Sequence, residues 1–102
     1  MGTRMAYFIE TFDKPDSREL RQQHRQEHHD YLEANRRILL ACGGKLADDS
    51  DAATGGVYLL DVETRAEAET FIAKDPFTQE GLFAEIRISR WRKAFIDGQS
   101  YL

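Results

Sequence analysis

Two histidines and a distant aspartate have the residue types and positions for acid–base chemistry. His24 and His28 are four residues apart, so in a helix their side chains share one face. That face is otherwise largely apolar, and Asp75 falls on the apolar side of a second helical stretch. An imidazole accepts a proton near neutral pH, and a carboxylate on its other nitrogen fixes its tautomer. His28 is therefore a candidate general base, and Asp75 is its candidate partner.

Structural explanations for the same residues stay open. A histidine on an apolar face is often satisfied by a backbone carbonyl, and an aspartate before Pro76 often caps the turn that follows. The spacing of His24 and His28 also occurs in zinc sites, but Arg25 stands where metalloproteases carry a glutamate, and a third ligand would still be needed. We expect no metal, and we leave the role of His24 open.

Several neighbouring residues are candidates for contacting a ligand. Arg25 suits an anionic substrate, although a surface ion pair of Arg21 or Arg25 with Glu10 or Glu27 is the alternative. Three aromatic residues are candidates for lining a small pocket, or else for packing in the core or an interface: Tyr7, Phe77 and Phe83. No nucleotide-binding fingerprint or cofactor motif occurs, so we expect chemistry without a cofactor.

The elements that position these side chains follow from hydrophobic periodicity and turn residues. Residues 5–12 predict a strand, which ends at an Asp-Lys-Pro-Asp turn. A helix is expected from about residue 17 to Cys42, before Gly43 and Gly44. Thr64 and Glu67 form a capping box for a second helix, which stops before the proline at 76. The remaining strands are expected at 45–47, 57–62 and 82–91.

The order strand, helix, strand, strand, helix, strand predicts an α+β fold of the ferredoxin-like type with a four-stranded antiparallel sheet. Two helices cover only one face of such a sheet. The other face also carries large apolar side chains in this sequence, since Phe8, Phe83 and Trp91 alternate with the residues expected inside. We therefore expect a homodimer in which the helix-free faces of two copies pack together.

Length and composition narrow the possible functions. The chain has 102 residues, 41% of them hydrophobic and 31% charged, and residues 1–102 are expected to form one domain. A net charge of -4 without a dense basic run argues against nucleic acid as a partner. No apolar stretch approaches the length of a membrane span, so we expect a cytoplasmic protein. Cys42 is expected to be a small buried hydrophobe, and the acidic segment 48–56 a solvated turn.

Four segments resemble a known family in the same order and with compatible spacing. They are the Arg-x-x-His-x-x-Tyr-Leu string at 25–32, the segment 68–77 that ends in Lys-Asp-Pro-Phe, Gly-Leu-Phe at 81–83, and Ile-Ser-Arg-Trp-Arg at 88–92. Together they are similar to the pattern of the YciI-like (YCII-related) family, and the similarity spans nearly the whole chain.

The resemblance implies a ferredoxin-like fold of the dimeric α+β barrel group. It also implies an active site formed by a helix histidine and the aspartate of the Asp-Pro pair, which correspond to His28 and Asp75. The activities associated with the family are lyase or isomerase reactions on small aromatic-derived compounds. Gly44 and Gly56 depart from the pattern, which commonly has proline and serine there, and the second change puts the substrate in doubt.

Two functions remain to be separated. One is a small lyase or isomerase in which His28, oriented by Asp75, moves a proton on a small cyclic or aromatic-derived metabolite. The other is a non-catalytic dimeric module that binds a small ligand or serves as an accessory subunit. A histidine in a cleft favours the enzyme, and a histidine packed among apolar atoms favours the module.

Overall fold

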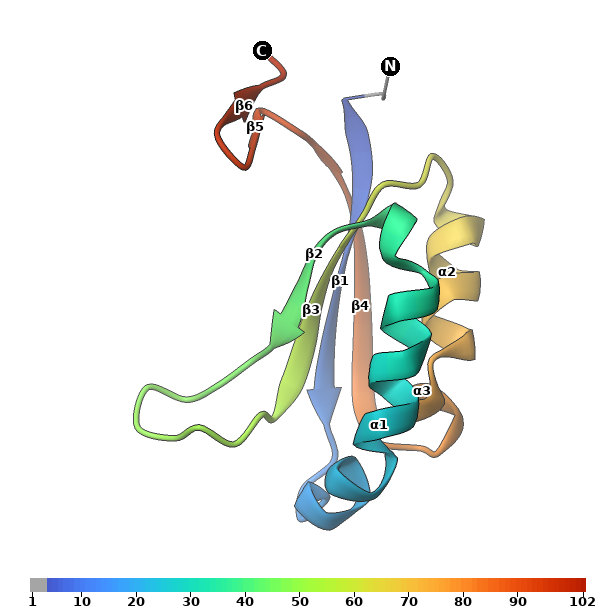
Figure 1. Ribbon diagram of the computed structural model, residues 1–102, viewed down its shortest axis with the longest axis vertical. Coiled ribbons are helices and arrows are strands. Elements are labelled where there is room, and N and C mark those ends of the chain that lie inside the picture. The colour runs from blue at the N-terminus through green and yellow to red at the C-terminus, as the bar shows by residue number, and fades with distance from the viewer. Residues whose placement is uncertain (1–3) are drawn as a thin grey trace.

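The computed structural model describes residues 4–102, in which four strands form one antiparallel sheet in the order β2-β3-β1-β4 (Figure 1). The strands are β1 (Met5–Asp13), β2 (Leu39–Gly44), β3 (Gly55–Leu60) and β4 (Phe83–Arg92). The helices α1 (Arg18–Ala34), α2 (Arg65–Lys74) and α3 (Pro76–Gln79) lie on one face of this sheet. This arrangement confirms the ferredoxin-like α+β fold.

The first helix ends at Ala34, so the expected continuation to Cys42 is wrong. The side chain of Asn35 at its C-cap donates to the Tyr31 carbonyl at 2.8 Å, a short 3₁₀ turn η1 (Arg36–Ile38) follows, and the chain then enters β2. The run Leu-Leu-Ala-Cys fits both a helical stripe and a strand, and pairing with β3 decides in favour of the strand. Residues 45–47, expected to be a strand, lie in the loop after β2.

The earlier end of α1 and the strand that follows it correct two further expectations. Gly43 and Gly44 pair with Val57 and Gly56 inside the sheet and do not end a helix. Cys42 is exposed on β2, because a strand position at the sheet edge lacks the cover that a helix packed on the sheet would receive.

The core lies between the sheet and α2. Ile9 of β1 and Leu60 of β3 are fully buried, and α2 contributes Ala68, Phe71 and Ile72 from above. The start of α2 confirms the predicted cap, because Thr64 Oγ1 accepts a hydrogen bond from the backbone N–H three residues later at 3.2 Å. Burial of this apolar side of α2 fixes the position of the last turn of α2 on the sheet. Asp75 follows that turn as the C-cap residue.

Phe83 packs against the core, whereas the sequence pattern placed it on the helix-free face. The β1–β4 register shifts between Phe12 and Asp13, so the strict alternation of sides along β4 fails at its first residue. The ring of Phe83 meets the ring of Phe77 edge-on, with centroids 6.1 Å apart.

Among the residues that the structure describes, no helix lies on the opposite face of the sheet (Figure 1). Phe8 and Leu59 are paired on it, and they are partly buried, as is Trp91 farther along. A small hairpin of β5 (Phe95–Ile96) and β6 (Gln99–Ser100), not foreseen from the sequence, follows β4. This hairpin and the loop between β2 and β3 both extend from the body on the side away from the helices.

Within residues 4–102, none of the helices has the length and apolar character needed to cross a membrane.

Candidate functional site

His28 and Asp75 form a direct pair beneath the first helix. Nδ1 of His28 lies 2.9 Å from both carboxylate oxygens of Asp75. His28 is 8% exposed and Asp75 is 0% exposed, so little water competes for this contact. Because a carboxylate only accepts hydrogen bonds, Nδ1 carries the proton, and the lone pair of the neutral ring is on Nε2. His28 was alternatively expected to pair with a backbone carbonyl, but its partner in the structure is the Asp75 carboxylate.

The backbone turn between α2 and α3 positions Asp75. The backbone N–H of Asp75 donates to the carbonyl of Ile72 at the end of α2. Pro76 then begins α3, where its ring suits the first helical position. Oδ1 of Asp75 accepts the backbone N–H of Phe77 at 2.9 Å. The capping role and the pairing with His28 were alternatives in the sequence, and the structure shows both in one side chain.

The ring of His28 is fixed by stacking as well as by hydrogen bonding. It lies nearly parallel to the ring of Phe77, with centroids 4.0 Å apart and an interplanar angle of 14°. Phe77 is 1% exposed and therefore has little freedom to move. The imidazole thus has Nδ1 engaged and one face covered, while no residue of the described range 4–102 forms a hydrogen bond with Nε2.

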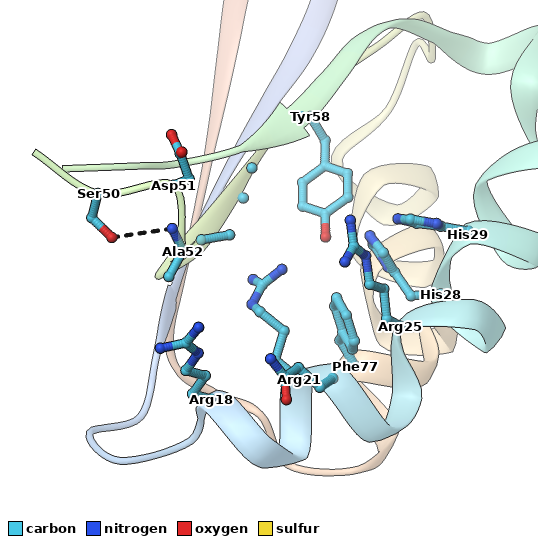
Figure 2. A pocket seen from close by; sticks show the side chains of 16 residues that line it. Arg18, Arg21, Arg25, His28, His29, Ser50, Asp51, Ala52, Tyr58 and Phe77 are labelled. Carbon is cyan, nitrogen blue, oxygen red and sulfur yellow. Dashed lines mark hydrogen bonds between the residues drawn. The ribbon is translucent and has the colours of Figure 1, made fainter. Parts of the chain in front are cut away.

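A cleft of about 460 Å³ opens beside this ring, a volume typical of small-molecule sites. Figure 2 shows His28, Phe77 and Tyr58 on one side of it and residues of the β2–β3 loop on the other. Glycine residues at the end of β2 and the start of β3 form part of the lining. The complete lining is Arg18, Arg21, Gln22, Arg25, His28, His29, Gly43, Gly44, Ser50, Asp51, Ala52, Ala53, Gly55, Gly56, Tyr58 and Phe77.

Positive charge gathers along this cleft although the chain as a whole is acidic. Arg21 is held by a two-pronged ion pair with Asp13, at 2.7 and 3.1 Å, which corrects the expected pairing with Glu10 or Glu27. Its guanidinium lies 4.8 Å from the centre of the Phe77 ring. Arg18 and Arg25 have no ion-pair partner within residues 4–102, so their charges are available to an anion.

The predicted ligand-contacting residues separate into two groups. Arg25 and Phe77 line the cleft. Tyr7 lies in the core, and Phe83 stands behind Phe77 without reaching the lining. Of the four predicted ligand-contacting residues, Arg25 and Phe77 therefore lie at the site, and Tyr7 and Phe83 have packing roles.

His24 has different surroundings from His28 despite sharing its helix. Its ring nitrogens lie 3.4 Å from Glu27 and 3.6 Å from Glu80, both well exposed carboxylates. In the described part of the chain, no three His, Cys, Asp or Glu side chains gather closely enough to hold a metal ion.

Tyr58 is the site residue that sequence analysis missed. It is 2% exposed, and its hydroxyl donates to Oδ2 of Asp75 at 3.3 Å. Burial, followed by the Asp75 carboxylate, raises the pKa of Tyr58 well above 10.0, so the hydroxyl keeps its proton. A signal was present, since Tyr58 and Leu60 alternate onto the inner face, but a strand tyrosine is ordinary and draws no attention.

The fold and the site together define a small ferredoxin-like α+β protein with a buried His–Asp pair at the wall of a cationic cleft. The chain matches the model of the YCII-related domain over residues 5–92 and belongs to that family.

Two solved structures and one further protein are similar to this chain over most of its length. The chain is similar to the 5-chloro-2-hydroxyhydroquinone dehydrochlorinase TftG from Burkholderia phenoliruptrix, solved with 2,5-dihydroxybenzoquinone, with a TM-score of 0.81 and 28% identity over 85% of this chain and 93% of that one. A dimeric ferredoxin-like protein of unknown function from Thermobifida fusca shares the fold, with a TM-score of 0.51 and 11% identity over 88% and 92% of the two chains. An uncharacterized protein of Haemophilus influenzae is 28% identical over 89% of this chain and 100% of its own.

Proposed function

We propose that this protein is a cofactor-independent lyase or isomerase that moves a proton on a small cyclic or aromatic-derived compound. The observation that carries the proposal is the position of His28, whose Nδ1 is engaged by Asp75 at 2.9 Å while its ring lines the cleft. The similarity to TftG, a dehydrochlorinase solved with a quinone, supports the reaction class and the kind of ligand.

The chemistry follows from the geometry. Nε2 of His28 accepts a proton from the bound compound, and the resulting imidazolium is stabilised by the buried Asp75 carboxylate. In an isomerase, the imidazolium returns the proton to a different atom of the compound. In a lyase, the electron pair left by the proton forms a double bond, and a leaving group departs with its own bonding pair.

The cationic rim supports an anionic or strongly polarised ligand. Arg25, a candidate from the sequence, and Arg18 extend over the cleft in Figure 2. A guanidinium binds a carboxylate or enolate oxygen with charge-assisted hydrogen bonds. The proposed role of Arg25 is to bind the charged end of the compound while His28 acts on its ring.

A proton-transfer assay tests the proposal directly. Hydroxylated and chlorinated quinols, beginning with 5-chloro-2-hydroxyhydroquinone, are incubated in D₂O, and mass spectrometry records deuterium uptake or loss of HCl. His28→Ala should abolish the reaction of the wild-type substrate while circular dichroism still shows a folded protein, with a lowered melting temperature because the buried Asp75 carboxylate loses its ring partner. Asp75→Asn should retain more turnover than His28→Ala, because the imidazole remains without support for its tautomer. A stability loss in His28→Ala with unchanged turnover would contradict the catalytic role.

We also propose that two copies associate through the helix-free face of the sheet. Phe8 and Leu59 form an apolar centre on that face, Trp91 adds to it, and the β2–β3 loop and the C-terminal hairpin extend toward the same side. Such a surface is more apolar than an isolated small protein usually leaves open. The similar protein from Thermobifida fusca is a dimer, which agrees with this proposal.

Light scattering at micromolar concentration is expected to give twice the monomer mass. Leu59→Arg should give a monomer, because it places a charge at the centre of the proposed interface. Ala73→Arg, on the exposed side of α2, is the matched control and should remain dimeric. Fluorescence of Trp91, the only tryptophan, should shift on dissociation. A wild-type monomer at these concentrations would exclude the proposed interface.

A further inference from the structure

Tyr58 stands at the junction of the buried pair and the cleft. Its ring lies edge-on to His28, with centroids 6.3 Å apart and an interplanar angle of 85°. Phe71 holds the same ring from another side at 5.9 Å. Figure 2 shows the Tyr58 hydroxyl directed toward the space bounded by His28, Arg21 and Phe77.

The hydroxyl of Tyr58 makes one long hydrogen bond. Its 3.3 Å contact with Oδ2 of Asp75 is long for a hydroxyl facing a carboxylate, where 2.5–2.7 Å is usual for a strong bond. The same oxygen lies 2.9 Å from Nδ1 of His28, so Asp75 keeps a partner if Tyr58 leaves. The cost of redirecting this hydroxyl to a ligand is therefore small.

Gly56 creates the room in which the Tyr58 side chain lies. A Cβ atom at position 56 would fall 3.2 Å from Cε1 of Tyr58 and 3.3 Å from its hydroxyl oxygen. The same atom would lie 3.2 Å from Oγ1 of Thr11 on the neighbouring strand, so the crowding comes from two sides. A side chain at position 56 would thus push the Tyr58 ring or Thr11 aside by a few tenths of an ångström.

We propose that Tyr58 is a catalytic hydrogen-bond donor, whose hydroxyl turns from Asp75 to a carbonyl oxygen of the ligand while His28 takes a proton from the carbon next to that carbonyl group. This inference rests on the proposed function. It narrows the substrates to compounds in which an acidic C–H lies next to a carbonyl group. Removal of that proton sends the electron pair toward the oxygen, where the Tyr58 donor stabilises the developing charge. The buried hydroxyl remains a donor because its pKa lies well above the usual value.

Binding of 2,5-dihydroxybenzoquinone, a ring compound with the required oxygens, provides the test by isothermal titration calorimetry. Tyr58→Phe should weaken binding about tenfold, the loss expected for one hydrogen bond to a charged oxygen. Gly56→Ala should weaken it by a similar factor although the hydroxyl is retained, because the added Cβ displaces the ring. Tyr31→Phe is the matched control: it also removes a hydroxyl, which donates to the Phe71 carbonyl at 2.7 Å and does not line the cleft, and it should leave binding unchanged.

The outcomes separate this inference from the proposed function. Wild-type affinity in Tyr58→Phe overturns the donor role, and so does failure of the wild-type protein to bind the quinone. A large loss of melting temperature in Tyr58→Phe without loss of affinity also overturns it, since the hydroxyl would then serve the fold alone. Weakened binding in Tyr58→Phe together with proton transfer that survives His28→Ala would keep the donor role and refute the proposed base.

Discussion

His24 and His28 lie one turn apart on the same helix and both side chains are largely buried, yet their carboxylate partners differ. His28 is buried against Phe77, and its Nδ1 is fixed by a carboxylate that is itself 0% exposed. His24 meets Glu27 and Glu80 at 3.4 and 3.6 Å, and both of these carboxylates extend into solvent. Spacing on one helix placed both rings on the same side, but only the element opposite His28 supplied a rigid partner. The helix face thus indicates two candidate histidines, and only His28 lies against the buried turn that carries Asp75.

The largest difference is expected in turnover. His28→Gln removes the base and should lower the rate of the proton-transfer assay by roughly 10²–10⁴-fold, the usual contribution of general acid–base catalysis. His24→Gln should stay within about twofold of wild type, because its partners are exposed and its ring has no place in the cleft lining. Equal losses in the two variants would mean that the shared helix face, and not the buried carboxylate, determines function.

The two carboxylate partners should also differ in their effect on stability. Asp75→Ala leaves the buried Nδ1 of His28 and the backbone N–H of Phe77 without an acceptor, and we expect a loss of about 2–4 kcal/mol in the free energy of unfolding. Glu80→Ala removes only an exposed ion pair and should cost less than about 1 kcal/mol. Urea denaturation measures both values. A small loss in Asp75→Ala would contradict the structural half of this comparison.

A smaller effect should appear in the reactivity of Cys42. Although Cys42 as a residue is exposed on β2, neighbouring atoms partly desolvate its thiol, and this desolvation, followed by the Asp75 carboxylate, raises the pKa of the thiol from 9.0 to about 11, so little thiolate exists at neutral pH. Alkylation by iodoacetamide should therefore accelerate with rising pH and reach half of its limiting rate near pH 11. Asp75→Asn should lower that midpoint but keep it above 9.0, because burial is the larger cause.

Glu80→Gln provides the control for this titration. Glu80 is not among the causes of the shift, so its substitution should leave the midpoint of Cys42 alkylation in place. An unchanged midpoint in Asp75→Asn would show that the charge of Asp75 does not reach β2.

The sequence predicted most of the fold and the pair at the site, for physical reasons that can be traced. Strand and helix periodicities differ clearly over β1, α2 and β4, so the order of elements follows. His28 and Asp75 each interrupt an apolar face, and burial of a polar group demands a partner. The resemblance to the YCII-related family pointed to the same two residues.

The errors arose where local pattern and tertiary pairing compete. Leu39 and Cys42 continue a helical stripe by spacing, but the pairing of this segment with β3 outweighs that preference. Tyr58 was missed because its contact with Asp75 exists only after the α2–α3 turn folds onto the sheet. Residues 48–51 of the β2–β3 loop are exposed, as expected of a solvated turn, but the place of the loop beside the cleft depends on how far the strands extend and was not foreseen.

The double use of Asp75 limits how this protein can be altered by engineering. In many enzymes, the groups that perform the reaction weaken the fold, and replacing them gains stability at the expense of activity. Here the carboxylate that orients His28 also begins α3, so its replacement should lose both. Under the proposed function, an inactive variant that keeps the contacts of Asp75 with α3, such as one needed to trap a ligand in crystals, should therefore be made by His28→Gln and not at Asp75.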